Sequence, residues 1–518
     1  MPEGRDSRGH RDSRRVTHPA IAGMPDAALL AQRPHAVVVG AGIAGLAAAA
    51  GLAERGVNVD VIESQTYLGG RVGGWTEHLP NDTEVPMNRG FHAFFRQYYN
   101  LRSLLRRADP DLSRLIPVDD YPLVDSAGRR DTFRGLPRTP PWNALIFALR
   151  SPTFRFRDLI RLNARAAAPL AAVTVPGTYR QLDDVNADTF LQNINFPAAA
   201  RHLAFEVFSR SFFAEPNQLS AAELAVMFHI YFLGSSEGLV FDVADDNFDT
   251  CLWQPLRQYL EGCGVRFQMG VAVREIDSGG PKAFRVHYGS GASIDADAVV
   301  LATDVRGLQR IVDKSNDFGD PMWRAAVAQM RTAPPFVVQR LWLDRPVADD
   351  RPAFLGTGGL KPLDNVSVLD RYERQAQDWA RRNGGSVVEL HAYAVSTEVE
   401  SVVDELTASL KRLYPETVGA RVVAQRVLYR EDCPRFAPGD HAGRPGVVTP
   451  HRCLMLAGDG IRIDLPVALM ERAATTGFDA ANRLLTGWGL ASHPLHTVPT
   501  QGRSTLLRRL AQERDIIQ

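Results

Sequence analysis

The stretch that decides the fold is HAVVVGAGIAGLAAAAGLAERGVNVDVIES, at residues 35–64. Its β-branched run, Val37–Val39, predicts a short buried strand, and the alanine-rich segment after the glycines predicts a helix. A second strand is expected from Val57 to Ile62. Because strand, tight turn, helix and strand follow one another at this spacing, the sequence predicts a parallel βαβ unit within an α/β fold.

The glycines of the turn have separate physical roles. Gly40 permits the tight turn, Gly42 lets the backbone approach a pyrophosphate, and Gly45 lets the helix pack closely on the strand. The helix then begins with Ile43 and Ala44, at the end where backbone amides face phosphates. The alternative is a turn that only packs a strand against a helix.

The second strand ends at an acidic residue. Glu63 follows Gly45 by 18 residues, the spacing at which a carboxylate binds ribose hydroxyls in a dinucleotide site. Its charge disfavours a 2′-phosphate at the same place. Strand, helix and acid together favour the dinucleotide site over plain packing.

A second glycine-rich segment, SQTYLGGRVGGW, follows at once at residues 64–75. It places small residues and a guanidinium beside the same site, where an arginine can clamp pyrophosphate oxygens. The alternative is a glycine-rich surface loop. The residues expected to contact the cofactor here are Ser64, Gly69, Gly70 and Arg71.

A third glycine motif lies near the C-terminus, in RCLMLAGDGIRIDLPVALMERAATTGFDAANRLL at residues 452–485. It predicts a strand at Cys453–Leu456, a turn at Gly458–Gly460, and a helix that begins near Pro466. The alternative role for the aspartate of this turn is to cap a helix. Small residues should let this helix pack against that of the first motif, namely Gly477, Ala480 and Ala481.

The segment MNRGFHAFFRQYYNLRSLLRR, from Met87, resembles the M…GxHxFFxxYYNL segment of plant-type ζ-carotene desaturases. It is still more similar to bacterial β-carotene desaturase/methylases, also called isorenieratene synthases. Further similarity runs through residues 196–256. With the GGR segment, it identifies the chain as a member of the amine oxidase and carotenoid desaturase superfamily of flavoproteins. The matching residues near Met87 are Gly90, His92, Phe94, Phe95, Tyr98, Tyr99 and Asn100.

The resemblance implies a Rossmann-like FAD-binding domain of the GR2/amine oxidase and phytoene desaturase type, with an interleaved α+β substrate domain. It implies that Asp459 bonds the ribityl or phosphate part of FAD, next to Gly458. Backbone amides around Val467 and Ala468 should face the pyrimidine edge of the flavin, and the backbone near Val273 should contact the adenine.

The domains are expected to be discontinuous, with a disordered Arg-rich tail at the start and an extension at the end. Two strands, Val265–Ile276 and Ala298–Ala302, should belong to the FAD domain. The expected segments are 1–33 for the tail, 34–95, 255–310 and 446–490 for the FAD-binding domain, 96–254 and 311–445 for the substrate and membrane-associating domain, and 491–518 for the extension.

Aromatic side chains in the substrate segments suit a long apolar ligand, although most of them are expected to be core. Asp464 is the preferred candidate base, because it lies between the ribityl turn and the flavin-facing helix. His92 and Arg89 are further catalytic candidates, and a hydrogen-bonded structural histidine is the alternative for His92. The candidate lining residues are Phe91, Phe94, Phe95, Phe205, Phe208, Phe212, Phe213, Phe228, Tyr231 and Phe232.

Charge and composition limit the partners. The 59 basic and 59 acidic residues balance, which gives no global attraction to nucleic acid, and the four cysteines lack metal-site spacing. The most apolar run, at 224–234, is too short to span a bilayer. Arginines and aromatic residues alternate at 137–169, which suits an anionic membrane surface, although a solvated helix is the alternative. We therefore expect peripheral attachment at the cytoplasmic face of the membrane.

The resemblance implies an FAD-dependent oxidoreductase that desaturates the β-ionone ring of β-carotene-type substrates. Migration of a methyl group would then give an aromatic end group, and an unnamed acceptor, a quinone or oxygen, would reoxidise the flavin. The alternatives are a linear carotene desaturase, a carotene cis-trans isomerase, and a non-catalytic carotenoid-binding protein with a flavin fold.

Overall fold

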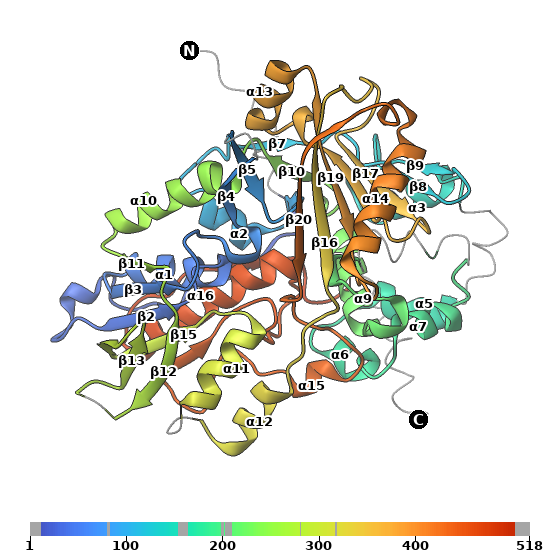
Figure 1. Cartoon of the computed structure of the whole chain (residues 1–518). Coiled ribbons are helices and arrows are strands. Elements are labelled where there is room, and N and C mark those ends of the chain that lie inside the picture. The colour runs from blue at the N-terminus through green and yellow to red at the C-terminus, as the bar shows by residue number, and fades with distance from the viewer. Residues whose placement is uncertain are drawn as a thin grey trace, which may run out of the picture.

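The computed structural model describes residues 12–79, 83–153, 164–197, 201, 210–279, 281–315 and 319–502. A parallel five-stranded sheet in the order β11-β3-β2-β15-β21 forms the core of one domain, and its first four strands are labelled on the left of Figure 1. Its strands come from three distant parts of the chain, at residues 35–63, 266–301 and 454–456, and long insertions separate these parts. They are β2 (His35–Val39), β3 (Asn58–Glu63), β11 (Arg266–Met269), β15 (Ala298–Leu301) and β21 (Leu454–Leu456).

Two helices pack together beside this sheet. α1 (Ile43–Ala53) is buried along its whole length and lies against α16 (Leu469–Gly487). A Cβ on Gly477 would stand 2.2 Å from the Ala44 carbonyl oxygen, and a Cβ on Gly51 would stand 2.8 Å from the Ala481 Cβ. The predicted small-residue face is therefore confirmed, since only such residues let the two backbones approach this closely.

The second segment of the cofactor domain differs from the sequence prediction. The single strand expected at 265–276 is two strands, because the chain turns at Gly270, whose φ is +71°. β11 joins the parallel sheet, whereas β12 (Val273–Ser278) forms an antiparallel sheet with β13 (Phe284–Tyr288) and β14 (Ala292–Ala296). The C-terminal helix also begins later than expected, at Leu469 rather than near Pro466.

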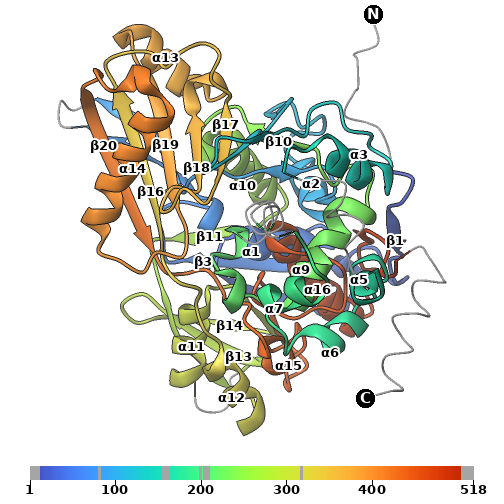
Figure 2. The same cartoon turned by 90° about the vertical axis from the view of Figure 1, so that its right-hand side faces the viewer.

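A seven-stranded sheet in the order β20-β16-β19-β18-β17-β8-β9 forms the body of the second domain (Figure 2). α14 (Val399–Leu413) covers one face of β16 and β19 over an apolar core. The opposite face carries buried polar residues. The strands are β8 (Leu123–Asp125), β9 (Arg130–Asp131), β16 (Phe336–Leu343), β17 (Phe354–Gly358), β18 (Asn365–Val368), β19 (Ser386–Ala392) and β20 (Val422–Arg430).

Short helices from the part of the sequence between β9 and β10 complete this domain (Figure 2). They are α3 (Trp142–Arg150), α5 (Ala164–Ala171), α6 (Gly177–Leu182), α7 (Ala187–Asn193) and α9 (Ala221–Phe228), with a π-helical turn at His229–Leu233 (η6). A second π-helical turn, Asp249–Trp253 (η7), and α10 (Gln254–Gly262) lie instead beside the cofactor domain, where α10 contacts α1 and η7 contacts β4. The apolar run at 224–234 is thus α9 and η6.

The remaining elements connect these layers or lie at the edges. They are β1 (Val16–His18), β4 (Gly74–His78), β5 (Glu84–Asn88), β6 (Phe94–Phe95), α2 (Tyr99–Leu105), β7 (Leu115–Pro117), β10 (Phe241–Ala244), α11 (Val305–Lys314), α12 (Pro321–Gln329), α13 (Arg374–Asn383), α15 (Asp440–Gly443) and β22 (Leu495–Thr497).

The expected disordered tail is wrong for residues 12–33. Asp12 is buried and accepts hydrogen bonds from the Ser235 and Tyr99 hydroxyls, and Arg14 donates to the Leu233 and Pro140 carbonyl oxygens. β1 pairs antiparallel with β22, which also orders part of the expected C-terminal extension. An Arg-rich segment without an apolar core predicts disorder, but the partners that order these residues come from distant parts of the chain, which composition does not reveal.

Candidate cofactor and active site

The glycine turn after β2 leaves no room for a side chain at Gly40 or at Gly45. Gly40 has a φ of +102°, and a Cβ there would stand 2.6 Å from the Ala302 carbonyl oxygen. A Cβ on Gly45 would stand 1.8 Å from the Gly40 oxygen. No side chain caps α1 at Gly42. The turn thus presents bare backbone and the positive end of a helix, which suits a phosphate group.

Glu63 lies beside this turn, at the carboxyl end of β3. Its carboxylate accepts hydrogen bonds from the Ala41 amide at 2.7 Å and from the Gln65 amide at 2.8 Å. The Ser64 hydroxyl donates to the same carboxylate at 3.1 Å. The acid is therefore held in a fixed orientation at the end of the sheet where dinucleotides bind.

The GGR segment lies directly on the glycine turn. The Gly69 amide donates to the Ala41 oxygen at 2.9 Å, and a Cβ on Gly70 would stand 3.2 Å from the Gly42 Cα. Both glycines have positive φ values, which other residues rarely adopt. The next residue, Arg71, is thereby placed beside the turn.

Arg71 forms a bidentate ion pair with Asp459, with N···O distances of 2.5 and 2.8 Å. These residues lie 388 positions apart in the sequence. The fold therefore brings the second and third glycine motifs together, as the predicted cofactor contacts require. A further predicted contact, Gly458, directly precedes Asp459, opens the loop that leads to α16 and has a φ of +150°.

The segment before β12 reaches the same place. The Val271 amide donates to the Glu63 oxygen, and the Gly270 amide donates to the Gln65 oxygen, both at 2.9 Å. Val273 follows as the first residue of β12 and is partly buried. The backbone near Val273 is thus next to the acidic end of β3, where the adenine contact was predicted.

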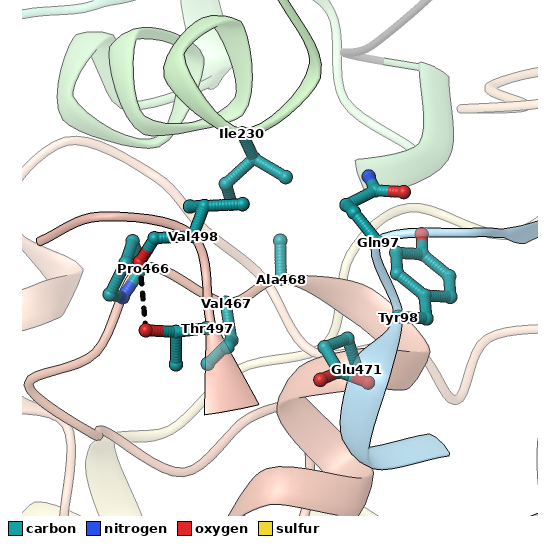
Figure 3. A pocket seen from close by; sticks show the side chains of 9 residues that line it. All are labelled: Gln97, Tyr98, Ile230, Pro466, Val467, Ala468, Glu471, Thr497 and Val498. Carbon is teal, nitrogen blue, oxygen red and sulfur yellow. Dashed lines mark hydrogen bonds between the residues drawn. The ribbon is translucent and has the colours of Figure 1, made fainter. Parts of the chain in front are cut away.

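Val467 and Ala468 are buried directly before α16 and line a small cavity (Figure 3). Gln97 lines it from the turn before α2, Ile230 from η6, and Val498 from the segment after β22. The cavity therefore joins the cofactor loop to the substrate domain.

His92 and Arg89 lie on the segment that follows β5. The His92 Nδ1 is 2.9 Å from the Gly90 oxygen. Because a carbonyl oxygen only accepts, Nδ1 carries the proton and Nε2 keeps its lone pair. Burial lowers the pKa of His92 to about 4, so the ring is neutral at ordinary pH. Arg89 pairs with Asp432 at 2.7 Å.

Asp464 has a different environment. It is exposed on the loop before the buried residues Pro466–Ala468. A base that removes a proton in a site closed to water is expected to be at least partly buried. The geometry therefore favours His92 over Asp464, the base preferred from the sequence.

The polar face of the seven-stranded sheet approaches the same segment. The His391 Nε2 donates to Glu389 at 2.8 Å, and the His391 Nδ1 lies 2.8 Å from the Tyr393 hydroxyl. A Cβ on Gly90 would stand 2.8 Å from His391 Cε1. Although burial opposes it, Arg340 lowers the pKa of Glu389 to about 2. This network fixes the turn that carries His92.

Several of the predicted aromatic residues form one connected cluster. Phe91 contacts Phe354 and Phe241, with ring centroids 4.5 and 6.1 Å apart, and Phe95 contacts Tyr231 at 4.6 Å. Stacked and tilted contacts continue from Phe241 through Tyr121, Phe133 and Phe147 to Phe232 and Phe228.

The three other predicted aromatic residues that the structure describes do not belong to this chain of contacts. Phe212 and Phe213 pack elsewhere, against Phe436 and Phe336 respectively. Phe205 and Phe208 lie outside the described residues. Phe94 is fully buried and contacts Phe248.

Comparison with known proteins agrees with this geometry. The model of the family "Flavin containing amine oxidoreductase" matches residues 43–485. The chain belongs to this family. It is 54% identical to "Carotenoid phi-ring synthase" of Streptomyces griseus over 98% of both chains. It is 25% identical to "Zeta-carotene desaturase" of Synechocystis, covering 86% of this chain and 96% of that one.

Solved structures give the same fold at low sequence identity. Putrescine oxidase aligns with a TM-score of 0.64 and 17% identity, over 88% of this chain and 99% of that one. UDP-galactopyranose mutase aligns with a TM-score of 0.62 and 13% identity, over 88% and 96%. The protein is therefore a carotenoid desaturase-like, FAD-dependent oxidoreductase of the Rossmann type.

The residues of this flavin oxidoreductase fit FAD. The glycine turn and the uncapped end of α1 suit the pyrophosphate, and Glu63 suits an unphosphorylated ribose. The Arg71 guanidinium and the Asp459 carboxylate supply a cation for phosphate and an acceptor for hydroxyls. The loop before α16 supplies backbone groups at Val467 and Ala468.

The sequence did not predict a group of buried polar residues on the seven-stranded sheet of the second domain. Glu389 and His391 alternate along β19, Tyr393 follows directly after its end, and Arg340 on β16 lies opposite Glu389. The available signal was polar residues at every second position, ELHAY, in a strand that is otherwise apolar. Nothing in the sequence alone shows that this face meets Gly90.

Proposed function

We propose that the protein desaturates the β-ionone ring of a β-carotene-type substrate and completes an aromatic end group by migration of one methyl group. The observation that carries this proposal is the 54% identity to a carotenoid phi-ring synthase across nearly the full length of both chains. The enzyme "Carotenoid phi-ring synthase" of Chlorobaculum tepidum is also similar, at 27% identity over 90% of this chain and 91% of that one.

The chemistry requires each ring to lose two hydrides and two protons. FAD, when bound, accepts a hydride from a ring carbon, and the conjugated chain delocalises the resulting cation. A shift of one geminal methyl group to the neighbouring cationic carbon removes the quaternary centre that prevents aromaticity. The chain's own tasks are to position the ring, exclude water and take up each proton.

His92 is our proposed proton acceptor. Its Nδ1–H is committed to the Gly90 oxygen, so Nε2 is free to accept. A carbon next to a carbocation is strongly acidic, so a neutral imidazole with a pKa of about 4 is a sufficient base. Arg89 and His391 hold this segment from two sides, through Asp432 and Gly90.

The aromatic cluster is our proposed binding surface for the apolar chain of the substrate. Phe91 belongs to this cluster and is the neighbour of His92, which joins the apolar surface to the base. Flat rings contact a conjugated polyene over a large area at little entropic cost. We propose a quinone or oxygen as the acceptor that reoxidises the flavin.

We also propose that the protein attaches peripherally to the cytoplasmic face of the membrane, where carotenoids reside. Among the described residues, no helix is long and apolar enough to cross a bilayer. α3 exposes Trp142, Leu145 and Leu149 to solvent, at 57, 43 and 57%. The exposed Arg138 and Arg150 flank them, so this helix combines an apolar face with positive charge.

The test of membrane attachment is sedimentation with vesicles that contain anionic lipid. A Leu145→Ser, Leu149→Ser variant should lose most of the bound fraction, since burial of two leucines contributes about 3–6 kcal/mol. A Met322→Ser variant removes an apolar residue that is 85% exposed on another helix, α12, and should bind normally. Equal binding of all three proteins would contradict the proposal.

The test of function is expression in bacteria that make β-carotene, followed by chromatography with mass and absorbance detection. A Glu63→Ala, Asp459→Ala variant is the control without cofactor contacts. An aromatic-ring carotenoid made only by the intact protein supports the proposal. Unchanged β-carotene despite bound FAD would overturn it and favour the second candidate, desaturation or isomerisation of a linear carotene, for which similarity to zeta-carotene desaturases speaks.

A further inference from the structure

α16 does more than pack against α1, because its first turns hold the loop that leads to it. This loop, Gly458–Ala468, contains the residues expected to bind the ribityl chain and pyrimidine edge of FAD. Arg472 donates from Nε to the Val467 oxygen at 3.0 Å and from Nη1 to the Asp459 oxygen at 3.4 Å. One side chain therefore connects both ends of the loop.

Thr476 holds the start of the same loop from the next turn of α16. Its hydroxyl accepts a hydrogen bond from the Gly458 amide at 2.9 Å and lies 3.1 Å from the Gly458 oxygen. Arg472 and Thr476 are four residues apart, so they project from the same face of the helix. Together they fix the backbone at three of the eleven loop positions.

Arg472 is itself fixed from the helical part of the second domain. Its Nη2 pairs with the Glu223 carboxylate of α9 at 2.8 Å, and its guanidinium lies over the Phe436 ring. Arg472 and Glu223 are 3 and 1% exposed. A charge buried this deeply is stable only when paired, and the pair leaves the guanidinium little freedom to move.

We propose that Arg472 and Thr476 are positioning residues that hold the flavin-binding loop in its binding conformation, and that Glu223 transmits the position of α9 to this loop. The loop is then preorganised before FAD arrives, so less entropy is lost on binding. The proposal rests on the assignment of this loop to FAD and is independent of which carotenoid is converted.

Arg472→Lys is the decisive variant. A lysine retains the charge opposite Glu223 but lacks the planar fork that spans two carbonyl oxygens. We expect the variant to fold and to bind FAD about tenfold or more weakly, since hydrogen bonds to a charged donor are lost. The measurement is titration of apoprotein with FAD, followed by quenching of flavin fluorescence and by the flavin absorption spectrum.

Arg444→Lys is the matched control. Arg444 is also buried, pairs with the other oxygen of Glu223 at 3.3 Å and lies over the same Phe436 ring. Within the described residues, no hydrogen bond connects its side chain to the loop. Its substitution should lower thermal stability while FAD affinity stays within about twofold of the original.

Thr476→Val tests the proposal at lower structural risk, because valine has nearly the same shape as threonine. We expect FAD affinity to fall about threefold to tenfold, as for the loss of a buried hydrogen bond. If Arg472→Lys does not fold, Thr476→Val decides the question.

Two results would overturn the proposal: unchanged FAD affinity in Arg472→Lys or in Thr476→Val, or an equal loss of affinity in Arg444→Lys. Because no carotenoid is present in the titration, a failure of the proposed ring chemistry would leave this result unaffected.

Discussion

The cofactor side and the substrate side of this molecule are assembled by different forces. Around FAD, glycines allow backbone to meet backbone, as where α16 approaches Ala44 through Gly477. Next to the segment that carries His92, the packing depends instead on buried ion pairs, such as that between Arg340 and Glu389. The first arrangement follows from local sequence and sterics, whereas the second depends on the tertiary fold. The two regions should therefore fail differently when they are altered.

The largest effect is expected where a buried charge loses its partner. Arg340→Met should lower the free energy of unfolding by about 3–5 kcal/mol, because Glu389 would remain buried without its counter-ion. Chemical denaturation measures the loss. Glu261→Gln, which breaks the exposed pair with Arg257, should change stability by less than about 0.5 kcal/mol. Similar losses in both variants would contradict the contrast between buried and exposed pairs.

A smaller loss of stability, with complete loss of flavin, is expected on the cofactor side. Gly45→Ala places a Cβ against the Gly40 oxygen and should cost about 1–3 kcal/mol as the turn shifts. FAD content of the purified protein, read from its absorbance, should fall close to zero. Gly262→Ala is the control, since nothing lies within 4 Å of its added Cβ. Retention of FAD in Gly45→Ala would show that the turn tolerates displacement.

Where the two sides meet, the proposed base should affect rate more than structure. His92→Phe should slow product formation about 10²- to 10⁴-fold, the usual contribution of a positioned base. Asp464→Asn should leave the rate within about threefold. The rate of the unaltered protein should fall as pH drops through about 4, because protonation occupies Nε2. If only Asp464→Asn slowed the reaction strongly, Asp464 and not His92 would be the base.

The smallest expected effect is a pH dependence of stability at Glu471, on α16. Burial raises the pKa of this carboxyl to about 8. The folded protein therefore binds a proton that the unfolded chain releases above its ordinary pKa, so stability falls as pH rises towards 8. The loss between pH 6 and 8 should be about 2 kcal/mol and should be absent in Glu471→Gln. An identical pH profile of both proteins would contradict this.

The sequence predicted the site best where a residue acts on elements that are adjacent to it in the chain. Gly40, Gly45 and Glu63 could be assigned because the turn, helix and strand that need them are adjacent in the chain. Arg71 and Asp459 could be named as cofactor contacts because each lies in a recognisable motif, whereas their ion pair appears only in the structure.

Prediction from the sequence failed where interacting residues lie far apart in the chain and belong to no recognisable motif. The order of residues 12–33 depends on Ser235, Leu233 and β22, which composition cannot reveal. The buried pair of Arg340 and Glu389 depends on strand register, and Arg472 resembles any helical arginine until its distance to Glu223 is known.

The pairing of β1 with β22 also has a consequence for synthesis on the ribosome. β1 emerges early, but its partner strand Leu495–Thr497 emerges among the last described residues. The parallel sheet has the same requirement, since β21 pairs with β15 and α16 must dock on α1. The nascent protein therefore cannot complete its FAD site before its C-terminal segments leave the exit tunnel. Until then the apolar α1 lacks its packing partner α16. Chaperone protection of the growing chain should matter more for this enzyme than for a protein whose domains are contiguous.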